Sequence, residues 1–87
     1  MNGLDKSSER LAKWLMKYVE KERGAVVSLK PGRAAEGAGI PLRHVAYFLR
    51  HLHNMGLVEK FNRNTYIFAR SRTNEIIEAL KKAVAAV

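Results

Sequence analysis

Apolar residues recur at three- and four-residue spacing in three segments of this chain, which is the period of a helix that buries one side. The segments cover residues 5–23, 41–55 and 73–87. In the first of them Trp14 and Tyr18 fall among the leucines of the apolar stripe, so we expect both aromatic side chains to lie in the core. The pattern therefore predicts three amphipathic helices.

Between the helices the pattern changes to that of short strands. Residues 25–29 form a β-branched run of the kind that pairs at a sheet edge. Residues 57–61 combine apolar with charged side chains, and residues 65–70 form a second run typical of strands. The polar residues 62–64 between them can turn the chain, because asparagine tolerates positive φ. We therefore predict a two-stranded hairpin over residues 57–70.

A short helix is expected at residues 31–38, where Pro31 suits the first helical position and Gly37 or Gly39 can end the helix. The alternative is a loop rich in alanine and glycine. The helix that starts at Pro41 follows after a tight turn, and two helices joined in this way form a helix-turn-helix.

With 87 residues the chain is expected to be one domain, residues 1–87, of the α+β class, mainly helical with a small antiparallel β wing and an additional C-terminal helix. No apolar run approaches the about 18 residues of a membrane span. The first residues also lack the apolar centre of a secretion signal, so a soluble, cytoplasmic protein is expected.

The helix at residues 41–55 carries the strongest functional signal. At about 100° per residue its apolar stripe collects Leu42, Val45, Leu49 and Leu52, with Phe48 at the edge. The opposite side has no carboxylate and is formed by Arg43, His44, Tyr47, Arg50, His51 and Asn54. Such side chains reach phosphates and base edges in the major groove of DNA. A solvated face is the alternative, but solvated faces usually mix glutamate with lysine.

Positive charge accompanies this helix. The chain has 16 Lys and Arg against 8 Asp and Glu, a formal net charge of +8 at pH 7. Residues 25–72 hold eight basic against two acidic side chains, whereas residues 1–24 hold six against four and residues 73–87 two against two. This distribution favours a polyanionic partner such as nucleic acid, with an anionic lipid surface as the alternative.

Several kinds of chemistry are not expected. Cysteine is absent, which excludes disulfides, thiolate nucleophiles and cysteine-ligated metal sites. No serine stands in a recognisable nucleophile–base motif, so an enzyme is not expected. His44 and His51 share a helix face, but no acidic residue nearby completes a metal shell, and we infer neither a metal nor a cofactor.

In the terminal helix, apolar residues repeat with 4-3-4 spacing at Ile76, Leu80, Ala83 and Val87. A stripe of this width can cover a partner's core, so we expect a homodimer through residues 73–87 with a contribution from the first helix. The alternative is a helix folded back on its own domain.

The order helix, strand, helix, helix and hairpin resembles that of winged helix-turn-helix DNA-binding domains. The local pattern of Val45, Leu49 and Leu52, followed by Met55, Gly56, Leu57 and Val58 ahead of the hairpin, carries the same resemblance. The resemblance covers about residues 7–70. Within it, the chain is similar to small archaeal and MarR-like or ArsR-like transcriptional regulators, including those of archaeal viruses and plasmids.

The resemblance implies a transcriptional regulator that binds double-stranded DNA as a homodimer, with the second helix of the motif in the major groove and the hairpin, or wing, on the backbone or in the minor groove. By position, the residues implied to contact DNA are Lys30, Arg33, Arg43, His44, Tyr47, Arg50, His51, Asn54, Lys60 and Arg63. No small-molecule effector is implied. Some winged helices instead bind RNA or proteins, and for a protein partner we expect apolar contacts such as Tyr47 and Phe48.

Overall fold

The computed structural model describes residues 3–85, with side chains as far as residue 83. The elements are α1 (Leu4–Lys21), β1 (Val26–Leu29), α2 (Pro31–Ala38), α3 (Leu42–Asn54), β2 (Glu59–Asn62), β3 (Thr65–Ala69), a 3-10 turn (Arg70–Arg72) and α4 (Thr73–Ala85). The predicted α+β class, mainly helical with a small antiparallel sheet, is confirmed. The last two residues of the predicted terminal helix, 86–87, lie outside the described residues.

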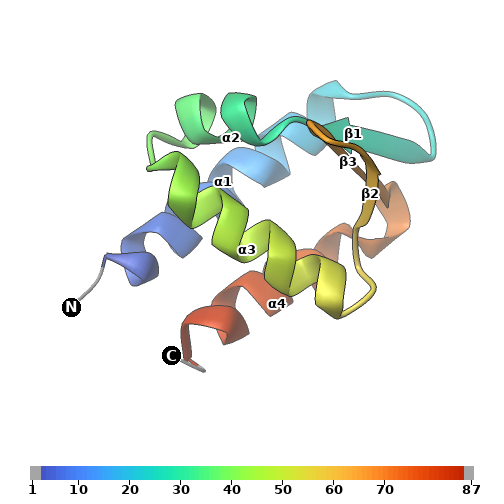
Figure 1. The fold of residues 1–87 in the computed structure, drawn as a ribbon. Coiled ribbons are helices and arrows are strands. Elements are labelled where there is room, and N and C mark those ends of the chain that lie inside the picture. The colour runs from blue at the N-terminus through green and yellow to red at the C-terminus, as the bar shows by residue number, and fades with distance from the viewer. Residues whose placement is uncertain (1–2, 86–87) are drawn as a thin grey trace.

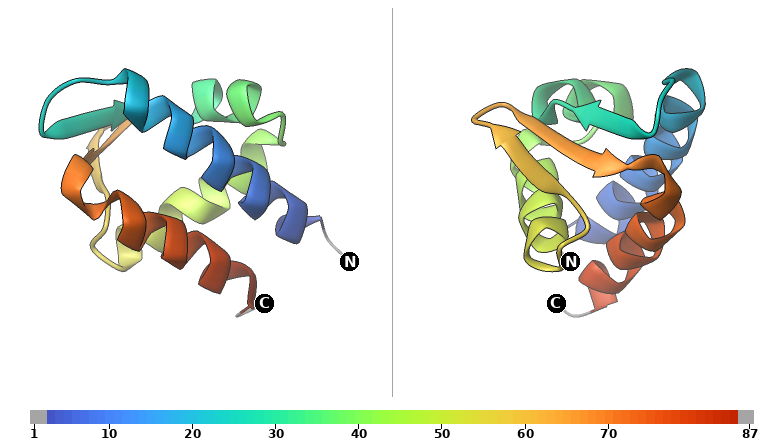
Figure 2. Two further views of the ribbon diagram at one scale, coloured as in Figure 1. Left: turned by 180° about the vertical axis from the view of Figure 1, so that it is seen from behind. Right: turned by 90° about the vertical axis from the view of Figure 1, so that its right-hand side faces the viewer.

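The helices lie in two layers with the sheet at one end (Figure 1). α1 and α4 lie side by side and run in opposite directions, while α3 crosses on the other side of the core (Figure 2). α2 packs on both α1 and α3. The sheet closes the end at which α1 and α3 finish and α4 begins. Within residues 3–85, no helix has both the length and the apolar character needed to cross a membrane.

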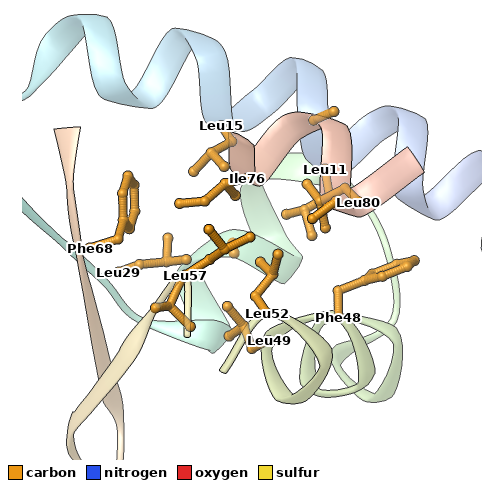
Figure 3. Packing of buried hydrophobic residues seen from close by; sticks show 14 of the residues in the cluster. Leu11, Leu15, Leu29, Phe48, Leu49, Leu52, Leu57, Phe68, Ile76 and Leu80 are labelled. Atoms are coloured by element: carbon orange, nitrogen blue, oxygen red, sulfur yellow. The ribbon is translucent and has the colours of Figure 1, made fainter. Parts of the chain in front are cut away.

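One hydrophobic core joins these layers (Figure 3). The largest fully buried side chains are Val27, Val45, Phe48, Leu49, Ile76 and Leu80. They come from β1, α3 and α4, and Leu11 and Leu15 of α1 and Phe68 of β3 pack against them. Trp14 and Tyr18, which the sequence places in the core, are only partly buried and lie at its edge. Because each helix buries a single stripe, the outer face of α3 stays open.

β3 is the central strand of a three-stranded antiparallel sheet with the order β1-β3-β2. β1 pairs with it so that Val27 lies opposite Phe68 and Leu29 opposite Tyr66. Val27, Leu29 and Phe68 are buried, so this face of the sheet closes the core. The prediction that residues 25–29 pair at a sheet edge is confirmed.

Arg70 closes the C-terminal end of α1. Its guanidinium donates hydrogen bonds to the carbonyl oxygens of Val19 (2.6 Å), Gly24 (2.8 Å) and Glu22. The last carbonyls of a helix have no partner within the helix, so a side chain that binds them stabilises its end. Arg70 follows β3 directly and therefore ties the sheet to α1.

α3 is rotated about its axis relative to the predicted stripe. Phe48, expected at the edge of the stripe, is fully buried, whereas Leu42, expected within it, is 55% exposed. The reason is that α1 and α4 cover the side of α3 that carries Phe48 (Figure 3). Pro41, expected as the first helical residue, is extended and precedes the helix, which begins at Leu42.

α3 ends at a glycine, as predicted. Gly56 has a φ of +76°, and its N–H donates to the carbonyl of His53 (3.0 Å), while the N–H of Leu57 donates to that of Leu52 (3.0 Å). These paired bonds and the burial of both leucines form a Schellman motif. The motif fixes the direction in which the chain leaves α3 toward the hairpin.

α4 packs on its own chain. Ile76, Leu80 and Ala83 are at most 1% exposed, and the hydroxyl of Ser8 in α1 donates to the carbonyl of Leu80 (2.8 Å). The apolar stripe of the terminal helix thus covers its own core, and its last member, Val87, lies outside the described residues. A dimer contact has to use another face of this helix.

Candidate nucleic-acid interface

The outer face of α3 carries three of the predicted contact residues in one row. Arg43, Arg50 and Asn54 are exposed and follow one another at spacings of seven and four residues, which places them along one side of the helix. Ala46 and His53 are also exposed beside this row. α3 contains no acidic residue. The helix therefore presents an open surface of cationic and amide groups.

Tyr47 and His51 lie on the flank of α3 that faces α4. The ring of Tyr47 stacks on that of His51 with 6.4 Å between their centroids, and its hydroxyl is 3.5 Å from the carbonyl oxygen of Ala83. Tyr47 remains 38% exposed, whereas His51 is half-buried. Both side chains border the exposed row without being part of it.

His44 is half-buried against α1, so its prediction as part of the outer face is wrong. Its Nδ1 is 2.6 Å from the hydroxyl oxygen of Ser7, at hydrogen-bonding distance. The rotation of α3 causes this contact, because it turns His44 toward the first turns of α1. No base for a serine was evident in the sequence, yet the fold pairs these two residues. Since Ser7 is 4% exposed, its hydroxyl is closed to a substrate, and the contact joins α1 to α3.

Lys30 lies beside the wing. It is exposed and precedes the first residue of α2. Its neighbour Leu29 pairs with Tyr66, so continuing the same register by one residue sets Lys30 next to Thr65, where β3 begins. From the sequence, Lys30 was expected near phosphates only because it lies at the start of a helix. The sheet register shows in addition that it lies beside the hairpin.

Arg33 is exposed but lies toward α1. Burial raises the pKa of the Tyr18 hydroxyl, the nearby Glu22 carboxylate raises it further, and the positive charge of Arg33 opposes the rise. Arg33 is thus a neighbour of Tyr18 on the α1 side of α2. This position is away from the row on α3.

The tip of the wing is a tight turn held by a side chain. The Asn62 amide oxygen accepts a hydrogen bond from the N–H of Asn64 (2.9 Å). Among residues 3–85 no residue other than glycine has a positive φ, so the turn does not use the positive φ that asparagine tolerates. The turn is instead of the kind in which an asparagine side chain replaces a backbone acceptor. Arg63 lies between the two asparagines and is exposed.

Phe61 interrupts the pairing of the wing strands. Lys60 lies opposite Tyr66 and Asn62 lies opposite Thr65, so Phe61 is the extra residue of a β-bulge. It is 68% exposed, more than any other large apolar side chain in the described residues. The mixture of apolar and charged residues in this segment gives no sign of a bulge, and for this reason the sequence did not single out Phe61.

Of the eight basic side chains in residues 25–72, six make no hydrogen bond or ion pair with the described part of the chain, namely Lys30, Arg33, Arg43, Arg50, Lys60 and Arg63. The two other arginines of the basic segment are engaged. Arg70 caps α1, and Arg72 pairs with Glu75 (3.3 Å) and donates to the carbonyl of Gly56 (3.1 Å). The unpaired groups are therefore free to meet an anion.

The wing and the outer face of α3 lie on the same side of the molecule. The right-hand view of Figure 2 shows the tip between β2 and β3 projecting past α3, away from α1 and α4. In Figure 1 this side faces the viewer. The row on α3 and the cations of the wing can therefore meet one extended partner together.

Comparisons with protein-family models, with curated proteins and with solved structures give no match. In the part of the chain that the structure describes, no three histidine, aspartate or glutamate side chains gather into a set that could hold a metal ion. The function is inferred from the surface just described.

Proposed function

We propose that this chain is a double-stranded DNA-binding protein of the winged helix-turn-helix type, a cytoplasmic transcriptional regulator without catalytic activity. α3 lies in the major groove, and the wing contacts the adjacent backbone or minor groove. The observation that carries the proposal is the row of Arg43, Arg50 and Asn54 on an exposed helix without a carboxylate, on the same side as the unpaired Lys60 and Arg63.

The dimensions and side chains of α3 suit a major groove. The groove is about 12 Å wide and admits a helix, and the 13 residues of α3 span about 20 Å. Arginine pairs in bidentate fashion with guanine and asparagine with adenine, which are roles for Arg43 or Arg50 and for Asn54. Lys30, Lys60 and Arg63 then contact phosphates. Arg33 and the half-buried His44 and His51 contribute little.

The direct test is a fluorescence-anisotropy titration of random-sequence duplex DNA at several salt concentrations between about 50 and 200 mM. Each phosphate neutralised makes the slope of log affinity against log salt more negative by about 0.9, so the five free cations on this side, Lys30, Arg43, Arg50, Lys60 and Arg63, give a slope of at most about −4.5. Duplex DNA should bind more tightly than duplex RNA of the same sequence. No binding to duplex DNA at about 50 mM salt contradicts the proposal.

The homodimer is proposed through a groove between α1 and α4. Apolar Ala12, Met16 and Ile77 line it, and its rim carries Asp5, Glu9, Lys13 and Lys81. Met16 is 54% exposed. A second copy related by a two-fold axis can set acids against lysines around this apolar centre. The groove lies behind α3, so the contact leaves the DNA-binding surface free (Figure 2).

Sedimentation equilibrium tests the dimer. The wild-type chain is expected to self-associate, and Met16→Glu should shift it to the monomer because a charge would then lie in the apolar centre. Lys17→Glu, an exposed change on α1 outside the groove, is the matched control and should leave the association unchanged. A monomeric wild-type chain at high concentration contradicts the dimer.

A second candidate is a protein-interaction module, which the exposed apolar residues at α3 and the wing favour. Leu42, Met55 and Phe61 are 55%, 50% and 68% exposed. Phe48, expected among the contacts of such a module, is fully buried and cannot serve. The salt titration of duplex DNA separates the two candidates, since a protein-interaction module is expected to bind duplex DNA little at about 150 mM salt, where non-specific phosphate contacts are already weakened.

A further inference from the structure

We infer that Phe61 is a wedge, which enters the minor groove of duplex DNA and partly unstacks one base step when the wing docks. This inference rests on the proposed DNA-binding function. It concerns a residue outside the predicted contact set and adds a preference for deformable DNA.

The first observation is the exposure of Phe61 at a bulge. The other phenylalanines described, Phe48 and Phe68, are buried in the core, whereas Phe61 is 68% exposed. Burying a phenylalanine side chain stabilises a structure, and the free chain does not make this gain with Phe61. The bulge takes Phe61 out of the regular alternation of the strand, and bulges commonly re-aim a side chain in this way. Its surface is available to a partner.

The second observation is the charge around it. Lys60 precedes Phe61 and Arg63 follows two residues later, and both are exposed and unpaired within residues 3–85. Glu59 is the nearest acid, but it pairs with Ile67 while Lys60 pairs with Tyr66, so Glu59 lies on the opposite face of the sheet from Lys60. A partner that contacts Phe61 at the wing tip therefore also meets the unpaired charges of Lys60 and Arg63.

This combination selects DNA over an apolar protein surface. A protein surface that buried Phe61 would also desolvate Lys60 and Arg63 without supplying anions, which is unfavourable. The minor groove supplies phosphates along both edges and attracts arginine by its negative potential. Proteins that bind there insert phenylalanine and other apolar side chains between base steps and kink the duplex.

The third observation is that the tip is held in place before binding. The hydrogen bond from the Asn64 N–H to the Asn62 side chain fixes the turn, and the bonded turn after α3 at Gly56 fixes the start of the hairpin. A preformed tip loses little entropy on docking. Pyrimidine–purine steps such as TA unstack most easily, so we expect the wing to favour a TA step beside the site that α3 contacts.

The test uses the full chain and a duplex with TA steps in which 2-aminopurine, whose fluorescence rises on unstacking, replaces adenine. Anisotropy of the same duplex measures binding independently. The wild-type chain should bind and raise the fluorescence several-fold. Phe61→Ala should bind with a similar salt slope, because the same phosphates are neutralised, but should give little fluorescence increase. Phe61→Leu keeps an apolar wedge and should retain part of the increase.

The outcomes separate the wedge from the proposed function. Binding by the wild-type chain without a fluorescence increase, or an equal increase with Phe61→Ala, overturns the wedge and leaves DNA binding intact. No binding by the wild-type chain overturns both. Phe61→Ala should have the same melting temperature as the wild-type chain, because the position is exposed. A missing fluorescence increase then reflects the missing side chain and not unfolding.

Discussion

Gly37 of α2 and Trp14 of α1 lie so close together that no larger residue fits between the two helices. A Cβ atom placed on Gly37 would lie 2.0 Å from Nε1 of the indole. Trp14 in turn stacks on Tyr18, with 4.7 Å between the ring centroids. α2 therefore packs directly on the indole ring of Trp14. Because α3 follows α2 after the short turn at Gly39, this contact also helps to set where α3 begins.

Gly37→Ala is expected to lower the free energy of unfolding by about 1–3 kcal/mol, measured by urea denaturation, because the added methyl group displaces the indole. A second effect opposes this one. In a helix interior alanine is favoured over glycine by about 1 kcal/mol, so the clash has to outweigh this gain. A variant as stable as the wild-type chain would show that α2 moves off Trp14 at little cost.

Gly32→Ala is the matched control in the same helix. No atom outside its immediate surroundings lies within 4 Å of a Cβ placed there, and its φ is not in the left-handed region. The substitution should therefore stabilise the chain by about 0.4–1 kcal/mol, mainly by reducing the freedom of the unfolded state. Destabilisation of both variants to the same extent would argue against a specific contact with Trp14.

Arg70→Ala is expected to lower the free energy of unfolding by about 1.5–3 kcal/mol, because three backbone carbonyls at the end of α1 lose a charged donor. Arg63→Ala removes the same charge from the exposed wing tip and should change stability by less than about 0.5 kcal/mol. In a DNA titration the order reverses, since Arg63 but not Arg70 belongs to the proposed interface. Equal stability losses from the two variants would contradict the capping role of Arg70.

Tyr18→Phe links stability to pH. In the folded chain, burial and then Glu22 hold the pKa of Tyr18 above its ordinary value of 10.0, which the unfolded chain keeps. As pH rises above about 10 the unfolded chain loses this proton first, so stability is lost between that pH and the raised folded value. The phenylalanine variant should show a shallower alkaline decline. Parallel declines in urea denaturation at about pH 9, 10 and 11 would contradict this.

The same variant has a second consequence at neutral pH. The Tyr18 hydroxyl donates a hydrogen bond to the carbonyl of Ser28 in β1 (2.6 Å), which Tyr18→Phe removes. We therefore expect a decrease in the free energy of unfolding of about 0.5–1.5 kcal/mol near pH 7. The alkaline decline of each protein is then measured relative to its own stability at pH 7.

The helices and the hairpin could be predicted from the sequence because each carries a local signal. A 3.6-residue period marks α1, α3 and α4, and Gly56 marks the end of α3 through its positive φ. The exposed row of Arg43, Arg50 and Asn54 followed from the same period. These residues lie far enough from the buried stripe that a moderate rotation of the helix leaves them exposed.

What the sequence could not provide depends on which elements become neighbours. The exchange of Phe48 and Leu42 between core and surface follows from the packing of α1 and α4 on one side of α3. The pairing of Ser7 with His44 joins positions on two different helices, and Arg70 reaches α1 from the end of β3. The exposure of Phe61 follows from a one-residue shift in strand register, which the local sequence does not reveal.

The outer face of α3 is the surface that we propose binds duplex DNA. The sharpest test compares Arg43→Ala/Arg50→Ala with Lys17→Ala/Lys21→Ala, which removes two charges that are also exposed but lie on α1. The α3 variant should bind duplex DNA at least about tenfold more weakly, with a salt slope smaller by about one for each phosphate that is no longer neutralised, while the α1 variant binds like the wild-type chain. Equal weakening of both variants would reduce the interaction to general charge attraction and contradict this claim.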